Sequence, residues 1–115
     1  MKNEQITTLI TQLKRLASEK ERPLWKRVAL DLEKPTRQRR IVNLWLIEQH
    51  AKDGEILIVP GKVLGDGELT KKVTVAAASY SDEARRKLAA AGSTMLTIEE
   101  LAKKQPDGKG VRILG

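Results

Sequence analysis

The chain has 115 residues, which suffices for one domain with a modest hydrophobic core. It contains no cysteine, and this excludes disulfides, thiolate metal sites and cysteine nucleophiles. Lysine and arginine number 22 against 15 aspartate and glutamate residues, giving a formal net charge of +7. A small basic domain of this kind favours a nucleic acid or an anionic membrane as partner, with a merely well-solvated surface as the alternative.

No apolar run approaches the roughly 20 residues needed to cross a bilayer, and the first residues do not form a signal peptide. We therefore expect a soluble, cytoplasmic protein without membrane contact. Its only aromatic residues are Trp25, Trp45 and Tyr80. Because readers of single-stranded RNA stack bases on aromatic side chains, we expect any nucleic acid to be bound through backbone charge and shape.

Two helices are predicted in the first third of the chain. Apolar residues recur at helical spacing over residues 4–18. Pro23 stands at a favoured first helical position and opens a second helix. That helix must end near Lys34, because Pro35 disfavours helical geometry in the residue before it.

The densest positive segment of the chain runs from Lys34 to Arg40. Residues 14–40 hold ten basic residues and four acids, a net charge of +6, so nearly the whole net charge lies there. A uniformly solvated surface would spread its net charge more evenly along the chain. The alternative interpretation of this segment is a linker kept soluble by charge. Pro35 and Thr36 should keep the backbone extended, so that the arginines fan outward at the start of the next helix.

The apolar run at residues 41–47 does not distinguish helix from strand by its periodicity. We predict a helix over residues 40–52, because the pattern continues to a stop at Asp53 and Gly54. A strand is the alternative.

The centre of the chain has two runs rich in β-branched residues, Ile56–Val59 and Val73–Ala78, which predict buried strands. Asp66 followed by Gly67 is a strong turn signal between them. We predict two core strands joined by a glycine-shaped loop whose lysines project into solvent and face a polyanion. The glycines and lysines of this stretch are Gly61, Gly65, Gly67, Lys62, Lys71 and Lys72.

Two further helices and a closing strand are predicted in the last third. Ser81 caps a helix that Gly92 ends. The capping-box pattern at Thr97–Glu100 opens a short last helix, and residues 111–114 form a strand. The predicted fold is a single α/β domain over residues 1–115, with a helical part at about 4–52 and irregular strand and helix turns at about 55–115.

The residues show no arrangement typical of catalysis. His50 lies near a predicted helix end, and Glu48, two residues away, points to a different face. Lys62 follows a glycine but precedes Val63 instead of the Ser or Thr of a phosphate-binding loop. The carboxylates are scattered and mostly have basic neighbours. We therefore expect no enzyme activity, metal, cofactor or small-molecule substrate.

Four segments resemble one known family: residues 32–35, 42–44, 59–67 and 71–78, with Val59–Gly65 the most specific. The family is the archaeal and eukaryotic large-subunit ribosomal protein numbered eighteen, related in fold to bacterial large-subunit protein fifteen. The resemblance covers essentially the whole chain. The chain has no long terminal extension of the kind expected in eukaryotic members, which favours an archaeal source. Tyr80 stands where phenylalanine is more often expected, a swap that should be harmless in a core.

The resemblance implies a compact α/β domain with a structural role in the large ribosomal subunit. It implies binding to large-subunit ribosomal RNA and to neighbouring large-subunit proteins, without an active site or cofactor, and we expect a monomer outside the ribosome. Glycines in the central loop would let RNA approach the backbone without side-chain clash. Charge and motif position together select the candidate RNA contacts Lys26, Arg27, Lys34, Arg37, Arg39, Arg40, Lys62, Lys71 and Lys72, with Gly61, Gly65 and Gly67 shaping the loop.

A DNA-binding regulator is the alternative from another function class. Predicted helices at 4–18, 23–33 and 40–52 with a basic turn can mimic a helix-turn-helix unit. Against it, no helix presents several Asn, Gln, Ser or Arg side chains in recognition order. The RNA-binding interpretation is therefore favoured.

Overall fold

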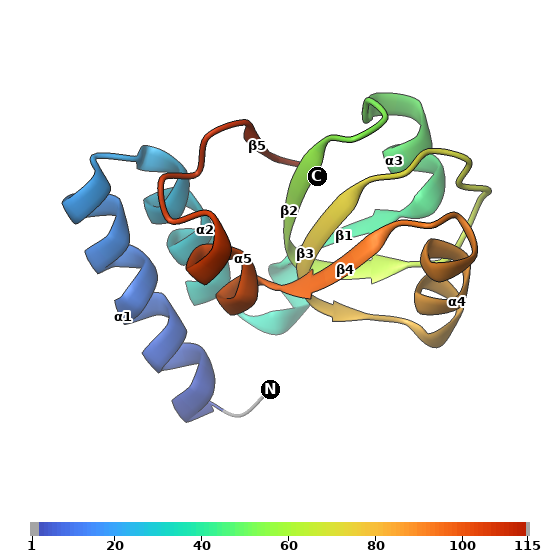
Figure 1. The fold of residues 1–115 in the computed structure, drawn as a ribbon. Helices are drawn as coiled ribbons and strands as arrows, with labels where there is room; N and C mark the ends of the chain where they lie inside the picture. Colours follow the sequence, from blue (N-terminus) through green and yellow to red (C-terminus); the bar gives the residue numbers. More distant parts are fainter. Residues whose placement is uncertain (1–2, 115) are drawn as a thin grey trace.

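The computed structural model describes residues 3–114, and a five-stranded sheet with parallel strand pairs lies at its centre (Figure 1). The strand order is β1-β2-β3-β4, and β5 also pairs with β2. The predicted α/β class is confirmed. In chain order the elements are α1 (Asn3–Lys20), α2 (Pro23–Glu33), the 3₁₀ helix η1 (Thr36–Gln38), β1 (Arg40–Asn43), α3 (Leu44–His50), β2 (Ile56–Leu64), β3 (Thr74–Tyr80), α4 (Asp82–Ala90), β4 (Thr94–Thr97), α5 (Ile98–Lys104) and β5 (Val111–Ile113).

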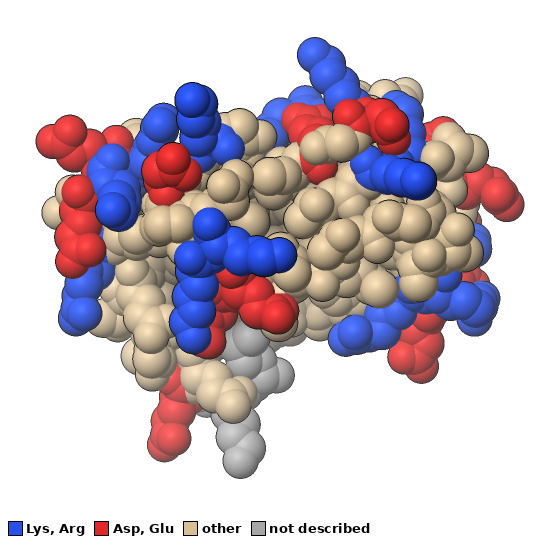
Figure 2. All heavy atoms as spheres, viewed as in Figure 1, with Lys and Arg blue, Asp and Glu red and all other residues tan. Residues whose placement is uncertain are grey.

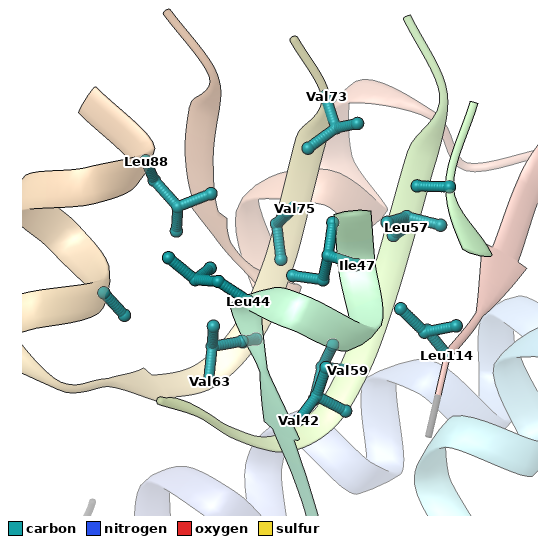
Figure 3. Packing of buried hydrophobic residues seen from close by; sticks show 13 residues of the cluster. Val42, Leu44, Ile47, Leu57, Val59, Val63, Val73, Val75, Leu88 and Leu114 are labelled. Atoms are coloured by element: carbon teal, nitrogen blue, oxygen red, sulfur yellow. The ribbon is translucent and has the colours of Figure 1, made fainter. Parts of the chain in front are cut away.

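Helices cover both faces of the sheet, because successive strand residues point to opposite faces. Leu57 and Val59 of β2 belong to the core beneath α3 and α4, whereas Ile58 between them belongs to the core beneath α1, α2 and α5. Figure 3 shows the first core, where Leu44 of α3 and Leu88 of α4 point towards the strands. The sheet therefore separates two hydrophobic cores.

The first two helices form as predicted, and both pack in the second core. The side chains of α1 and α2 that face the sheet are buried, as their helical spacing requires. Trp25 of α2 is fully buried, and its indole Nε1–H donates to the carbonyl of Pro106 at 2.9 Å. This bond ties α2 to the loop before β5, 81 residues further along the chain.

The prediction of a helix over residues 40–52 is wrong for its first four residues. Arg40–Asn43 is the strand β1, and α3 begins only at Leu44 and ends at His50. β1 pairs in parallel with residues 61–64 of β2. Two β-branched residues suit this strand, and the long-range pairing outweighs the local helical pattern. The strand alternative therefore holds for these four residues.

The helix-turn-helix interpretation is also wrong. α2 packs in the core that contains Trp25, whereas Leu44 and Ile47 of α3 pack in the core on the other face of the sheet. β1 stands between the two helices in the chain. The two helices therefore do not form the adjacent pair that a helix-turn-helix unit needs.

β2 runs further than predicted, through Pro60 and Gly61 to Leu64. A proline removes one donor from the ladder of a strand and is tolerated where the ladder is irregular. Here the register between β2 and β3 shifts between Val59 and Lys62, on either side of Pro60. Gly61 and Lys62 therefore belong to the strand and not to the loop in which they are predicted.

The connection from β2 to β3, residues 65–73, forms neither helix nor strand and is hydrogen-bonded to α3. The Trp45 N–H at the start of α3 donates to the carbonyl of Asp66 at 3.0 Å. Further along, the Thr70 hydroxyl and N–H donate to the Glu48 carboxylate at 2.6 and 3.0 Å. These two bonds hold the pKa of Glu48 below its ordinary value. The return path that parallel strands require is thus fixed on α3.

The caps of α4 and α5 form as predicted. The Ser81 hydroxyl accepts the N–H of Ala84 at 3.1 Å, and Thr97 forms the reciprocal capping box with Glu100. Gly92, with φ of 77°, follows α4 in the left-handed conformation. Strand β5 is also confirmed, whereas the sequence pattern does not indicate β4, whose four residues lack apolar alternation.

Tyr80 is half-buried beside the first core, and its hydroxyl lies within hydrogen-bonding distance of two backbone carbonyls. It lies 2.8 Å from the carbonyl of Val75 and 2.6 Å from that of Leu96, so it donates to one of them at a time. Burial raises the pKa of Tyr80 to about 12. Phenylalanine at this position would keep the ring packing and lose this link between β3 and β4.

Candidate nucleic-acid interface

The basic segment 34–40 contains the 3₁₀ turn η1 and ends at the first residue of β1. Lys34 ends α2, and the carbonyls of Pro35 and Thr36 accept the N–H groups of Gln38 and Arg39 at 2.8 and 3.2 Å. Arg37 lies in this turn, is exposed, and forms no ion pair with any residue of 3–114. Its guanidinium is therefore available to an anionic partner.

The other two arginines of the turn do not fan outward, and this prediction is wrong for them. Arg39 donates from Nε to the carbonyl of Lys34 at 3.2 Å and from Nη2 to that of Leu32 at 3.0 Å. These carbonyls lie at the end of α2, where the helix has no partners of its own for them. Arg39 thus caps α2 from its C-terminal side.

Arg40 forms an ion pair with Asp31, the buried acid of α2. Its Nε and Nη2 both lie 3.1 Å from Oδ2 of Asp31, and the Lys34 ammonium lies 3.2 Å from Oδ1. Only 6% of Asp31 is exposed, so its charge has to be paired within the fold. The pair of Asp31 with Lys34 has a recognisable signal, since the two residues are three apart at the end of a helix. The contact of Asp31 with Arg40, nine residues later, has no such signal.

The lysines of the central stretch differ in environment. Lys62 on β2 and Lys72 before β3 are exposed and form no ion pair within residues 3–114. Lys71 instead donates from Nζ to the carbonyls of Glu48 and Ala51, both at 2.6 Å. Its ammonium therefore caps the end of α3, and the prediction that it projects into solvent is wrong.

Replacing Lys71 by methionine is expected to lower the free energy of unfolding by about 1–3 kcal/mol, because two carbonyls lose a charged donor. The neighbouring Lys72→Met, which removes an exposed ammonium, should change it by less than about 0.5 kcal/mol. Urea unfolding followed by circular dichroism measures both values. Equal stabilities of the two variants would show that the Lys71 contacts contribute nothing.

The three glycines of the central stretch approach this chain's own atoms. A Cβ on Gly61 would lie 1.9 Å from the carbonyl oxygen of Arg40. On Gly65 it would lie 2.6 Å from the Glu83 side chain. On Gly67, whose φ is +98°, it would lie 2.6 Å from Cβ of Trp45. Close packing inside the protein therefore accounts for all three glycines without RNA.

Lys87 of α4 is a structural residue that sequence reasoning missed. Its Nζ donates to the carbonyls of Gly65 and Gly67, both at 2.9 Å. The same ammonium lies 3.6 Å from the carboxylate of Glu83, one helical turn earlier. The bend between β2 and the segment along α3 is thus held by α4, and no spacing in the sequence indicates this contact.

Lys26 and Arg27 lie exposed on α2 and are not ion-paired within residues 3–114. On the face shown in Figure 2, basic and acidic side chains are intermingled over the helices and at the rim. The surface over β3 and β4 carries few charges. On this face, charged side chains of both signs therefore lie mainly over the helices and at the rim.

Within residues 3–114, no three His, Cys, Asp or Glu side chains converge in a way that would hold a metal ion. His50 lies at the end of a helix, α3, as predicted, and it is exposed. None of the helices in this range is both long enough and apolar enough to cross a membrane.

Comparison with known proteins identifies the family. The profile of the family described as "Ribosomal protein 60S L18 and 50S L18e" matches residues 2–115. A protein of Archaeoglobus fulgidus named large ribosomal subunit protein eL18 is 46% identical over 112 residues, covering 97% of this chain and 96% of that protein. Proteins of the same name from Pyrobaculum aerophilum and Methanoregula boonei are each 45% identical over 112 residues, covering 97% of this chain and 92% and 93% of theirs. The chain therefore belongs to the family of ribosomal proteins 60S L18 and 50S L18e, and its similarity to archaeal members agrees with the resemblance read from its motifs.

Proposed function

We propose that this protein is a non-catalytic structural component of the large ribosomal subunit that binds large-subunit ribosomal RNA. Membership of a ribosomal protein family supports the first part. One structural observation carries the second: exposed basic side chains among the predicted contacts are not ion-paired within residues 3–114. They are Lys26, Arg27, Arg37, Lys62 and Lys72.

Cations without an internal acid partner suit phosphate contacts. Binding to RNA displaces counterions from phosphates, and a cation without an ion pair in the fold has no such pair to break when it meets a phosphate. Lys34 remains a candidate, since 52% of its side chain is exposed beside Asp31. Arg39 and Lys71 have roles within the fold that are sufficient to explain them. As part of this proposal, the protein acts in the cytoplasm, is a monomer before assembly and lies beside other large-subunit proteins afterwards.

Reversing the charge at Arg37 and Lys62 together should weaken binding to protein-free large-subunit ribosomal RNA about 100-fold, at roughly tenfold for each lost phosphate contact. Filter binding at moderate salt measures the affinity, and circular dichroism verifies that Arg37→Glu with Lys62→Glu folds. The matched control is Lys20→Glu with Arg86→Glu, which changes the net charge equally at exposed positions of α1 and α4.

Equal losses in the two double variants would show that net charge, and not the predicted contacts, governs binding.

In cells, the protein should sediment with large subunits on a sucrose gradient and stay with them after a high-salt wash. Recovery only at the top of the gradient would contradict the proposed function.

A further inference from the structure

A groove between the start of α2 and β5 brings together arginines from three separate elements. Arg27 of α2, Arg40 of β1 and Arg112 of β5 all line it. The half-buried side chains of Leu24, Val111 and Ile113 line the same groove. None of the described residues that line it is acidic. Arg112 is not among the candidate contacts predicted from the sequence, because more than 70 residues separate it from the other two arginines.

Two carboxylates outside the groove hold two of these guanidinium groups. Asp31 binds Arg40 at 3.1 Å from both Nε and Nη2. Glu55 binds Arg112 with both carboxylate oxygens at 2.9 Å, and the carbonyl of His50 accepts from Arg112 at 2.8 Å. Guanidinium groups fixed in this way lose little side-chain entropy when they bind a ligand.

Arg27 supplies the charge that has no counterion. It lies four residues before Asp31, and therefore on the same face of α2. It is exposed and is not ion-paired within residues 3–114. Asp31 is shared between Arg40 and Lys34, and Glu55 pairs with Arg112, so neither carboxylate balances the charge of Arg27. Guanidinium forks match the geometry of phosphate oxygens, which makes phosphate the ligand that this groove suits.

We propose that this groove binds phosphate groups of the RNA backbone, with Arg27, Arg40 and Arg112 as donors and Asp31 and Glu55 as positioning residues. The inference rests on the proposed RNA-binding function and names a site for it that the basic turn alone does not include. The apolar side chains at the groove limit the water around the guanidinium groups, which strengthens their contacts with phosphate. Free phosphate offers the same chemistry as the RNA backbone, so the test has to separate the two.

Arg27→Ala is the most direct test of the groove, because this side chain is exposed and its removal breaks no ion pair in the described chain. It should weaken binding to protein-free large-subunit ribosomal RNA about tenfold. The slope of log affinity against log salt concentration should become shallower by roughly 0.7–1, the value of one lost phosphate contact. Arg86→Ala on α4 is the matched control and should change neither quantity.

Arg112→Lys tests whether the two arginines act on one ligand. Lysine keeps the charge next to Glu55 and loses the forked geometry, so affinity should fall while circular dichroism and the unfolding midpoint show an intact fold. Because both side chains contact the same phosphates, the combined loss in the double variant with Arg27→Ala should differ from the sum of the single losses. Arg27→Ala combined with Arg86→Ala should be additive.

The outcomes separate this inference from the proposed function. If the wild-type protein binds the RNA and Arg27→Ala behaves like Arg86→Ala, the groove is not a phosphate site and the proposed function stands. Additive losses from Arg27→Ala and Arg112→Lys would also show that the two arginines do not contact the same ligand. Saturable binding of inorganic phosphate alone, with RNA affinity unchanged in both variants, would assign the groove to a free anion. Absence of RNA binding by the wild-type protein would reject both proposals.

Discussion

Replacing Gly61 by alanine is expected to lower the free energy of unfolding by about 3 kcal/mol or more, at the upper end of overpacking effects. A Cβ at this position would lie 1.9 Å from the carbonyl oxygen, 2.7 Å from the carbonyl carbon and 2.9 Å from the nitrogen of Arg40. All three are backbone atoms of β1, which pairs with β2 at this point. No side-chain rotation relieves the clash, so the two strands have to move apart. Thermal unfolding followed by circular dichroism should show a midpoint lowered by roughly 10 °C or more.

Gly54→Ala is the matched control for this prediction. Gly54 has a φ of +84°, and a Cβ there would meet no atom within 4 Å. Its replacement costs only the left-handed backbone conformation, about 1 kcal/mol. A Gly61→Ala variant that is no less stable than Gly54→Ala would show that β1 does not approach β2 as closely as the structure describes.

Trp25→Ala is expected to destabilise the protein by about 3–5 kcal/mol, the range for emptying a large aromatic site in a core. Trp25 is fully buried among the side chains of the second core. Its loss also removes the donor to the Pro106 carbonyl, which is the bond that ties α2 to the loop before β5. Urea unfolding should therefore show a lower midpoint, and amide exchange should become faster in β5.

Trp25→Phe separates packing from hydrogen bonding at the same site. Phenylalanine keeps most of the apolar contact and cannot donate, so a smaller loss of about 1–2 kcal/mol is expected. Exchange in β5 should still accelerate, because the link to Pro106 is absent in both variants. If Trp25→Phe leaves β5 exchange unchanged, the indole hydrogen bond does not hold the C-terminal strand.

The features that the sequence predicts correctly depend on residues close together in the chain. The spacing of apolar residues in α1, Pro23 at the start of α2, and the capping residues Ser81 and Thr97 all act within one or two helical turns. Short-range rules decide such features, so the structure confirms them. The same is true of the β-branched runs that become β2 and β3, because a fully buried strand is marked by its own composition.

The features that the sequence does not predict depend on contacts between distant residues. Residues 40–43 join the sheet because residues 61–64 offer them a strand edge, which no local pattern reveals. Of the basic turn, Arg37 is exposed as expected, whereas Arg39 and Arg40 bind groups at the end of α2. Whether a cation is free or paired depends on which carbonyl or carboxylate the fold brings beside it.

By itself, therefore, the sequence determined the class of fold, the helices and their caps, the excess of positive charge and, through its central motif, the family. Tertiary structure alone decided how individual basic residues are used. It assigned Lys71 and Lys87 to backbone carbonyls and brought Arg112 beside Arg27 and Arg40. The physical reason is range: propensity and capping act over a few residues, whereas ion pairs and grooves form between side chains that only the folded sheet brings together.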